Sequence, residues 1–247
     1  MDNPFRAKPL ILAHRGASAT APENTLAAFQ AALAAGADGI ECDCRLTADG
    51  QVVILHDATL ERTTNGQGPV SAWRAADLAR LDASGRGSEN PDPRYQIPTL
   101  ASLQTLDPAC ILNLELKGPP DDETHHLAER VAEWITRHGW MKRVIVSSFN
   151  HHLLRAVHEH DPGIETGALW SARFGDPVAI LQGTPAKNAH LDAEFLSARD
   201  IRTLQAAGYR VIAWNVANLA EAQRLTAAGI DGLILDDPGW RRQLVVP

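Results

Sequence analysis

The stretch from residue 39 to residue 45 reads GIECDCR, and its side chains alternate in character at every step. Successive side chains of a strand point to opposite faces. Glu41, Asp43 and Arg45 therefore share one face, and the two intervening cysteines share the other. The stretch predicts a strand with one charged face and one apolar face.

A second stretch has the same arrangement. Residues 112–117 read LNLELK, which places Glu115 and Lys117 on one face and leucines on the other. In a closed barrel the apolar faces pack under helices, and the alternate side chains point inward. Inward carboxylates are costly unless they are paired or bind a metal ion. The two stretches therefore predict barrel strands with charged side chains in the interior.

Helix-like segments that end in glycine recur before strand-like runs. The triplet AAG occurs at 34–36, 206–208 and 227–229, and Gly139 occupies the same place before residues 144–146. Glycine tolerates the left-handed backbone that ends many helices. Repeated helix–glycine–strand units predict an α/β fold with a parallel sheet.

Nine segments read as strands. The segment at 52–56 follows Asp49-Gly50, a hairpin signal, so we expect it to extend the 39–45 strand in the antiparallel sense. Eight strands remain, and the 247 residues of the chain match the length of a TIM (β/α)₈ barrel. The nine candidates are Leu10–His14, Gly39–Arg45, Val52–His56, Ile111–Lys117, Val144–Ser148, Glu165–Trp170, Ala186–Asp192, Tyr209–Val216 and Gly232–Leu235.

Residues from about 59 to 98 interrupt the regular succession of helix-like and strand-like segments. They are rich in Gly, Pro, Asn and Arg, with one helical piece around 73–81. They far exceed the roughly 2–6 residues of an ordinary α/β connection. We expect a small insertion after the second strand, over one end of the barrel. The whole chain, 1–247, is then expected to form a single barrel domain.

Charge and composition exclude several classes of protein. The formal net charge is −7 and there is no basic stripe, which argues against nucleic-acid binding. No apolar run reaches the roughly 18 residues of a membrane span, and the N-terminus lacks the pattern of a signal peptide. Three cysteines do not make a disulfide framework. We therefore expect a cytoplasmic protein without membrane insertion.

The carboxylates of Glu41, Asp43 and Glu115 allow two interpretations. Side chains two apart on a strand can lean together around one hard cation. All-oxygen ligation then favours Mg²⁺ or Ca²⁺. The same carboxylates could instead form an ion-pair layer with Arg45 and Lys117. Strand spacing alone leaves both interpretations open.

His14 and His56 each end a predicted strand. Barrel active sites are built at strand ends, and histidine is the usual side chain for proton transfer near neutral pH. Two such histidines beside three inward carboxylates favour a metal-assisted active site over a structural ion-pair layer.

A longer set of motifs runs through the chain in a fixed order. It comprises His14-Arg15-Gly16, Pro22-Glu23-Asn24-Thr25, Glu41-x-Asp43, His56-Asp57, Glu115-x-Lys117, Ser148-Phe149-Asn150, Trp214-Asn215-Val216 and Asp231-Gly232…Asp236-x-Pro238. This ordered set, from about residue 10 to 240, resembles the glycerophosphodiester phosphodiesterase family. Two places depart from the family pattern: Cys42 and Cys44 stand where apolar residues are usual, and Leu235-Asp236 where Thr-Asp is common.

The resemblance implies a TIM barrel with an insertion after the second strand. It also implies cleavage of a small glycerophosphodiester to sn-glycerol 3-phosphate and an alcohol, with one divalent cation, Mg²⁺ or Ca²⁺. The attacking group, water or the glycerol 2-hydroxyl, stays open, as does the oligomeric state, with a homodimer as one alternative. By position, the implied roles are an acid–base pair of His14 and His56, phosphate-binding Arg15 and Lys117, a pocket wall at Trp214, and metal ligands Glu41, Asp43 and Glu115.

Other functions on the same fold are weaker alternatives. A lysophospholipase D or phosphoinositide-cleaving enzyme needs an apolar entry, for which the sequence offers no exposed apolar stretch. A non-catalytic phosphate-binding barrel would lack a histidine or a carboxylate of the set, and none is missing. An aldol-type enzyme needs a Schiff-base lysine, and the neighbouring Glu115 opposes the lowered pKa that Lys117 would need for that role.

Overall fold

The computed structural model describes residues 9–85, 93–118 and 125–244. Eight parallel strands close into a barrel in the order β1-β9-β8-β7-β6-β5-β4-β2, and β2 pairs back to β1. This confirms the predicted TIM barrel. The strands are β1 (Leu10–His14), β2 (Gly39–Leu46), β3 (Val52–Ile54), β4 (Ile111–Leu116), β5 (Val144–Ser148), β6 (Glu165–Trp170), β7 (Asn188–Asp192), β8 (Arg210–Trp214) and β9 (Gly232–Leu235).

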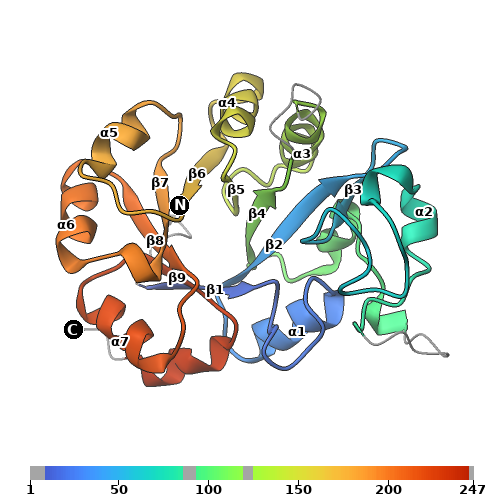
Figure 1. Ribbon diagram of the computed structural model, residues 1–247, viewed down its shortest axis with the longest axis horizontal. Helices are drawn as coiled ribbons and strands as arrows, with labels where there is room; N and C mark the ends of the chain where they lie inside the picture. The colour runs from blue at the N-terminus through green and yellow to red at the C-terminus, as the bar shows by residue number, and fades with distance from the viewer. Residues whose placement is uncertain (1–8, 86–92, 119–124, 245–247) are drawn as a thin grey trace.

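Helices surround the strands (Figure 1). Most of them connect one parallel strand to the next, as the repeated helix–glycine–strand pattern predicts, and Gly36, Gly139, Gly208 and Gly229 all have positive φ. The helices are α1 (Leu26–Ala34), α2 (Ala75–Leu78), α3 (His125–Arg137), α4 (His151–His160), α5 (Pro177–Gln182), α6 (Ala198–Ala206) and α7 (Leu219–Ala227).

The predicted strand bounds agree with the structure to within two residues. Strand β8 ends at Trp214 rather than at Val216, because Asn215 has a φ of 55° and leaves the extended region. Strand β3 is shorter than predicted, but its antiparallel pairing with β2 matches Ile54 to Cys44, as the hairpin signal requires.

Strands β2 and β4 lie side by side in parallel, with Asp43 opposite Glu115. This register brings the two charged strand faces together. On the outer face of β2, Cys42 and Cys44 are buried in an apolar cluster with Phe29 of α1. The cysteines therefore face the helices, and the charged side chains face the barrel interior.

The barrel interior is divided along its axis. Near the N-terminal ends of the strands it is filled by apolar side chains, including Leu10, Ile111 and Ile145. The histidine that ends β1 and the lysine that follows β4 lie at the opposite, C-terminal ends. Close packing at one end therefore leaves the polar groups at the end where barrel enzymes place their active sites.

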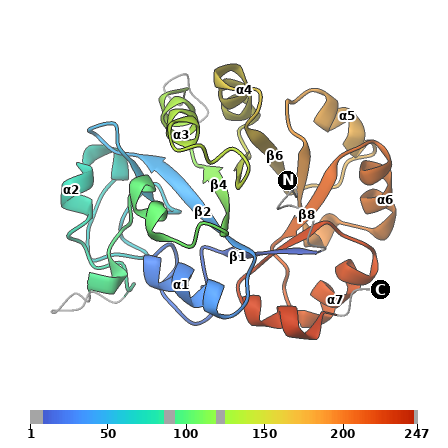
Figure 2. The same ribbon diagram turned by 180° about the vertical axis from the view of Figure 1, so that it is seen from behind.

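The segment between β3 and β4 lies beside the barrel, next to β2 (Figures 1 and 2). Its helix α2 is shorter than the helical piece predicted at 73–81; Trp73 and Arg74 are both extended, so the helix begins only at Ala75. The segment packs around an apolar cluster of its own, to which Leu60, Val70 and Leu78 belong. Among the described residues, no helix has both the length and the apolar character needed to cross a membrane.

Candidate active site

The chain turns sharply where β1 ends. Arg15 has a φ of 55° and Gly16 a φ of 85°. A side chain at Gly16 would place its Cβ 2.6 Å from the carbonyl carbon of Ala28, so only glycine lets this loop pack on α1. The turn directs the backbone N–H of Arg15 to Glu41, whose Oε2 accepts it at 3.1 Å.

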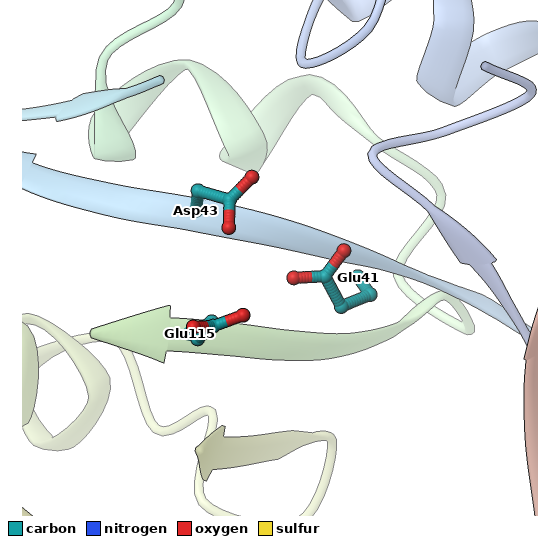
Figure 3. A group of neighbouring side chains, drawn as sticks. All are labelled: Glu41, Asp43 and Glu115. Atoms are coloured by element: carbon teal, nitrogen blue, oxygen red, sulfur yellow. The ribbon is translucent and has the colours of Figure 1, made fainter. Parts of the chain in front are cut away.

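Three buried carboxylates lie together on the two neighbouring strands β2 and β4 (Figure 3). They belong to Glu41, Asp43 and Glu115, which are 3%, 1% and 8% exposed. One oxygen from each residue lies within 4.8 Å of the others. The register of β2 and β4 thus brings the predicted acidic residues close enough to share one cation.

Two cations and one amide surround Asp43. Lys117 Nζ lies 3.3 Å from Asp43 Oδ1 and 2.5 Å from Glu115 Oε1. Arg15 Nε lies 3.4 Å from Asp43 Oδ2, to which Asn24 donates from Nδ2 at 2.7 Å. Arg45 takes no part, because its guanidinium donates to the backbone carbonyl of His56 instead. In the alternative interpretation, the ion-pair layer included Arg45 and Lys117; the pairs in the structure are made by Lys117 and Arg15.

The acidic cluster carries more negative charge than these cations balance. Burial raises the pKa of Glu41, and the charges of Asp43 and Glu115 raise it further. Burial also raises the pKa of Glu115, to about 6. Burial acts in the same direction on Asp43, but the charges of Lys117 and Arg15 outweigh it and lower the pKa of that carboxyl.

These properties fit a divalent cation. Glu41 Oε1 is buried, and it has no hydrogen-bond partner in the described part of the chain. A bound cation would supply that partner and would balance the excess negative charge without protonating Glu41. The donors are all carboxylate oxygens, which Mg²⁺ and Ca²⁺ prefer.

Each of the two predicted histidines is held by an aspartate. His14 Nδ1 lies 2.6 Å from Asp236 Oδ1, and His56 Nδ1 lies 2.6 Å from Asp57 Oδ1. A carboxylate at Nδ1 selects the tautomer that carries its proton there. Nε2 is then the nitrogen free to exchange protons. Burial lowers the pKa of His56, which favours its neutral form near pH 7.

One cavity of about 330 Å³ opens at this end of the barrel. Every predicted site residue except Asp43 lines it, and Asp43 lies beneath it, held by Asn24. The lining residues that the sequence predicts are His14, Arg15, Glu41, His56, Glu115, Lys117 and Trp214.

The lining of the cavity also contains aromatic side chains, Phe149 and Trp214. The rings of Phe149 and Trp214 meet edge to face, with their centroids 5.4 Å apart. Phe149 is 47% exposed, which is unusual for a phenylalanine. A cavity lined by both charged groups and aromatic rings suits a ligand with an anionic part and a carbon skeleton.

Sequence reasoning missed the residues that hold the predicted ones. Asn24, Asp57 and Asp236 belong to the quoted motifs, but nothing in their spacing assigns them a partner. His190 of β7 was also missed. Its ring packs in the barrel over Gly167, fully buried, and neither ring nitrogen has a partner within the described residues. Burial lowers the pKa of His190 to about 3.

Comparison with known proteins places this chain and its fold among relatives of one kind. The model of the glycerophosphoryl diester phosphodiesterase family matches residues 14–240. A glycerophosphodiester phosphodiesterase of Caldanaerobacter subterraneus subsp. tengcongensis is 35% identical over 237 residues, covering 94% of this chain and 95% of its own. A glycerophosphodiester phosphodiesterase of Bacillus subtilis is 31% identical over 245 residues, covering 93% of this chain and 84% of its own.

Solved structures are similar over the same length. The structure of an Oleispira antarctica phosphodiesterase in complex with the product sn-glycerol-3-phosphate matches with a TM-score of 0.86 and 30% identity. The match covers 98% of this chain and 99% of that one. A glycerophosphodiester phosphodiesterase from Thermotoga maritima matches with a TM-score of 0.77 and 26% identity, over 97% of this chain and 100% of its own.

Proposed function

Because this chain belongs to the glycerophosphoryl diester phosphodiesterase family and is therefore a phosphodiester hydrolase, we propose that it cleaves small glycerophosphodiesters. The products are sn-glycerol 3-phosphate and an alcohol. The observation that carries the proposal is the cavity itself, which has two histidines, two cations and two of the three carboxylates in its lining.

Glu41, Asp43 and Glu115 are proposed to hold one divalent cation, Mg²⁺ or Ca²⁺. Such an ion supplies Lewis-acid chemistry, by withdrawing charge from a phosphate oxygen. Arg15 and Lys117 line the cavity beside the carboxylates and bind the remaining phosphate charge. They are buried enough for that attraction to be strong, and it grows as negative charge develops on the phosphoryl oxygens in the transition state.

His14 and His56 are proposed to move the two protons of the reaction. One Nε2 takes a proton from the attacking hydroxyl, and the other donates a proton to the leaving alcohol. The attacking group is water or the 2-hydroxyl of the substrate's glycerol, and the second route passes through a cyclic phosphate. The aspartates at Nδ1 keep each ring in one tautomer and stabilise it when it is protonated.

Trp214 and Phe149 are proposed to cover the carbon skeleton of the substrate. Both rings line the cavity, and the Phe149 ring lies close to a cation, with its centroid 5.9 Å from Lys117 Nζ. The cytoplasmic location stays a prediction, supported by the three unpaired buried cysteines, Cys42, Cys44 and Cys110.

The decisive experiment is an assay of glycerol 3-phosphate release from glycerophosphocholine. Protein stripped with a chelator should be inactive and should recover with Mg²⁺ or Ca²⁺. Transient cyclic phosphate in the product mixture would identify the 2-hydroxyl as the attacking group. Lysophosphatidylcholine should be a much poorer substrate, and a preference for it would contradict the proposal. Metal-restored protein without turnover on any glycerophosphodiester would also contradict it.

A further inference from the structure

Arg62 joins two loops at the edge of the active site. It lies in the segment between β3 and β4, and its guanidinium binds two carboxylates at once. Nη1 and Nη2 donate to Glu23 Oε2 and Oε1, both at 2.8 Å. Nε and Nη2 donate to Asp57 Oδ2 and Oδ1, at 2.5 Å and 3.1 Å. Both pairs are bidentate, the geometry in which arginine is most specific.

Each of these carboxylates has a second partner that lines the cavity. Glu23 Oε1 also accepts from Arg15 Nη1 at 2.9 Å. Asp57 Oδ1 lies 2.6 Å from His56 Nδ1. The contacts form one continuous chain, Arg15–Glu23–Arg62–Asp57–His56, which we name the Arg62 bridge. It connects a proposed phosphate-binding cation to a proposed acid–base histidine.

The Arg62 side chain is 47% exposed, so solvent partly screens its ion pairs. The segment that carries it is held by its own apolar cluster, which includes Leu60, Val70 and Leu78. Attachment of the segment to the barrel therefore does not require Arg62. Its two bidentate pairs instead fix the directions of two carboxylates.

Arg62 also fixes the charge of the two carboxylates. Its hydrogen bonds are the largest cause of the lowered pKa of Asp57. Burial opposes ionisation of Glu23, but Arg62 and Arg15 together outweigh it and lower that pKa as well. Without Arg62, the hydrogen-bonding side chains left to these carboxylates among the described residues would be Arg15 for Glu23 and His56 for Asp57. Both carboxylates would then be free to turn.

We infer that Arg62 is a positioning residue that fixes Arg15 and His56 together, through Glu23 and Asp57, without touching the substrate. The inference rests on the proposed function, because it assigns Arg15 to phosphate binding and His56 to proton transfer. Arg62 itself lies outside the lining of the cavity. The two arms of the bridge act on different steps: the Glu23 arm on binding and the Asp57 arm on turnover.

The test compares Arg62→Met with Arg80→Met. Methionine keeps an unbranched apolar stem and removes the charge. Arg80 belongs to the same segment, is 81% exposed and pairs only loosely with Asp77, at 3.6 Å. We expect Arg62→Met to lower kcat/KM for glycerophosphocholine by about 10- to 100-fold, the scale of a misplaced catalytic group. Arg80→Met should leave it unchanged, and both variants should keep the urea midpoint of the wild type.

The two arms can be separated. Glu23→Gln should mainly weaken binding of sn-glycerol 3-phosphate, measured by calorimetry, and Asp57→Asn should mainly lower kcat. Arg62→Met should show both effects. Compared with Arg62→Met, the Arg62→Lys variant should recover only part of the product binding and part of kcat, because an ammonium cannot make two bidentate pairs. A loss of folding would not divide in this way between binding and turnover.

Two results would overturn the inference. One is an Arg62→Met variant with wild-type kcat and wild-type product affinity. The other is an activity loss that merely follows the loss of folded protein, as measured by urea unfolding. Turnover of glycerophosphocholine by the wild type is measured first and tests the proposed function separately. If that turnover is absent, the proposed function fails, whereas calorimetry on Arg62→Met still tests the link from Arg62 to Arg15.

Discussion

Asn24 holds Asp43 with both ends of its amide. Nδ2 donates to Asp43 Oδ2 at 2.7 Å, and Oδ1 accepts from the backbone N–H of Asp43 at 3.3 Å. Asn24 has a φ of 57°, a left-handed conformation that asparagine adopts more readily than most residues. One residue therefore makes the turn before α1 and orients a proposed metal ligand.

Replacing Asn24 with glycine should weaken the binding of the divalent cation. Glycine keeps the left-handed turn, so the substitution removes the two hydrogen bonds without straining the backbone. Loss of such a supporting contact typically costs about 10- to 100-fold in metal affinity or activity. The measurement is the Mg²⁺ or Ca²⁺ concentration that gives half-maximal release of glycerol 3-phosphate.

Asn218→Gly is the control for that substitution. Asn218 caps α7 and accepts from the backbone of Glu221, outside the lining of the cavity. Exchanging an N-cap asparagine for glycine costs only a few tenths of a kcal/mol. Equal metal dependence in the two variants would show that Asn24 does not support the ion.

His14→Ala should lower kcat by about 10²- to 10⁴-fold, the usual contribution of one proton-transfer group. Asp236→Asn should cause a smaller loss, because the ring stays but its tautomer and orientation are no longer fixed by a charge. His152→Ala, at an exposed position of α4, is the control. Steady-state assays on glycerophosphocholine give the comparison, and a fully active His14→Ala variant would remove His14 from the mechanism.

Metal binding should be visible without any assay of activity. Adding Mg²⁺ or Ca²⁺ to chelator-treated protein should raise its Tm, because a ligand that binds only the folded state stabilises it by about 2.7 kcal/mol at a hundred times its Kd. Glu41→Gln should abolish this shift, since it replaces a charged ligand. Glu129→Gln, on the exposed face of α3, should leave the shift intact. Equal shifts in both variants would place the ion elsewhere.

The pH dependence of stability should reflect His190. Its pKa is about 3 in the folded protein against 6.5 for a free histidine, because burial disfavours the charged ring. The unfolded chain therefore binds the extra proton first, and stability falls as the pH drops from 6.5 towards 3. The slope is about 1.4 kcal/mol per pH unit, so this group contributes a loss of about 2 kcal/mol between about pH 7.5 and pH 5.

His190→Phe isolates that contribution. Phenylalanine keeps a planar ring over Gly167 and removes the titrating group. Urea unfolding at the two pH values should show about 2 kcal/mol less destabilisation in the variant than in the wild type. If the free energies of unfolding of the variant and the wild type changed equally with pH, His190 would already be protonated, or accessible to water, in the folded protein.

Much of the fold could be read from short-range pattern. The alternation of Glu41, Cys42 and Asp43 identifies a strand with one charged face, and glycines at helix ends mark where each unit begins again. Both are properties of neighbouring residues, since side-chain direction in a strand and left-handed φ at a helix end are fixed locally. The same alternation of side chains predicted that the acidic residues of β2 and β4 all face the barrel interior.

The partners of the site residues could not be read in this way. His14 binds Asp236 across 222 positions, and Arg62 binds Glu23 across 39. No periodicity connects such pairs. Arg45, which one alternative interpretation paired with the carboxylates, shows the same limit. A strand pattern fixes the face on which Arg45 lies, but its long side chain reaches the carbonyl of His56 instead.

The sequence by itself determined the order of strands and helices, the charged strand faces and the candidate site residues. Only the tertiary structure decided which carboxylate holds which histidine, which side chains Asn24 and Arg62 contact, and where the cavity lies. The physical reason is the distance along the chain over which each kind of interaction acts. Backbone preferences act between adjacent residues, whereas hydrogen bonds and ion pairs depend on the register and closure of the whole barrel.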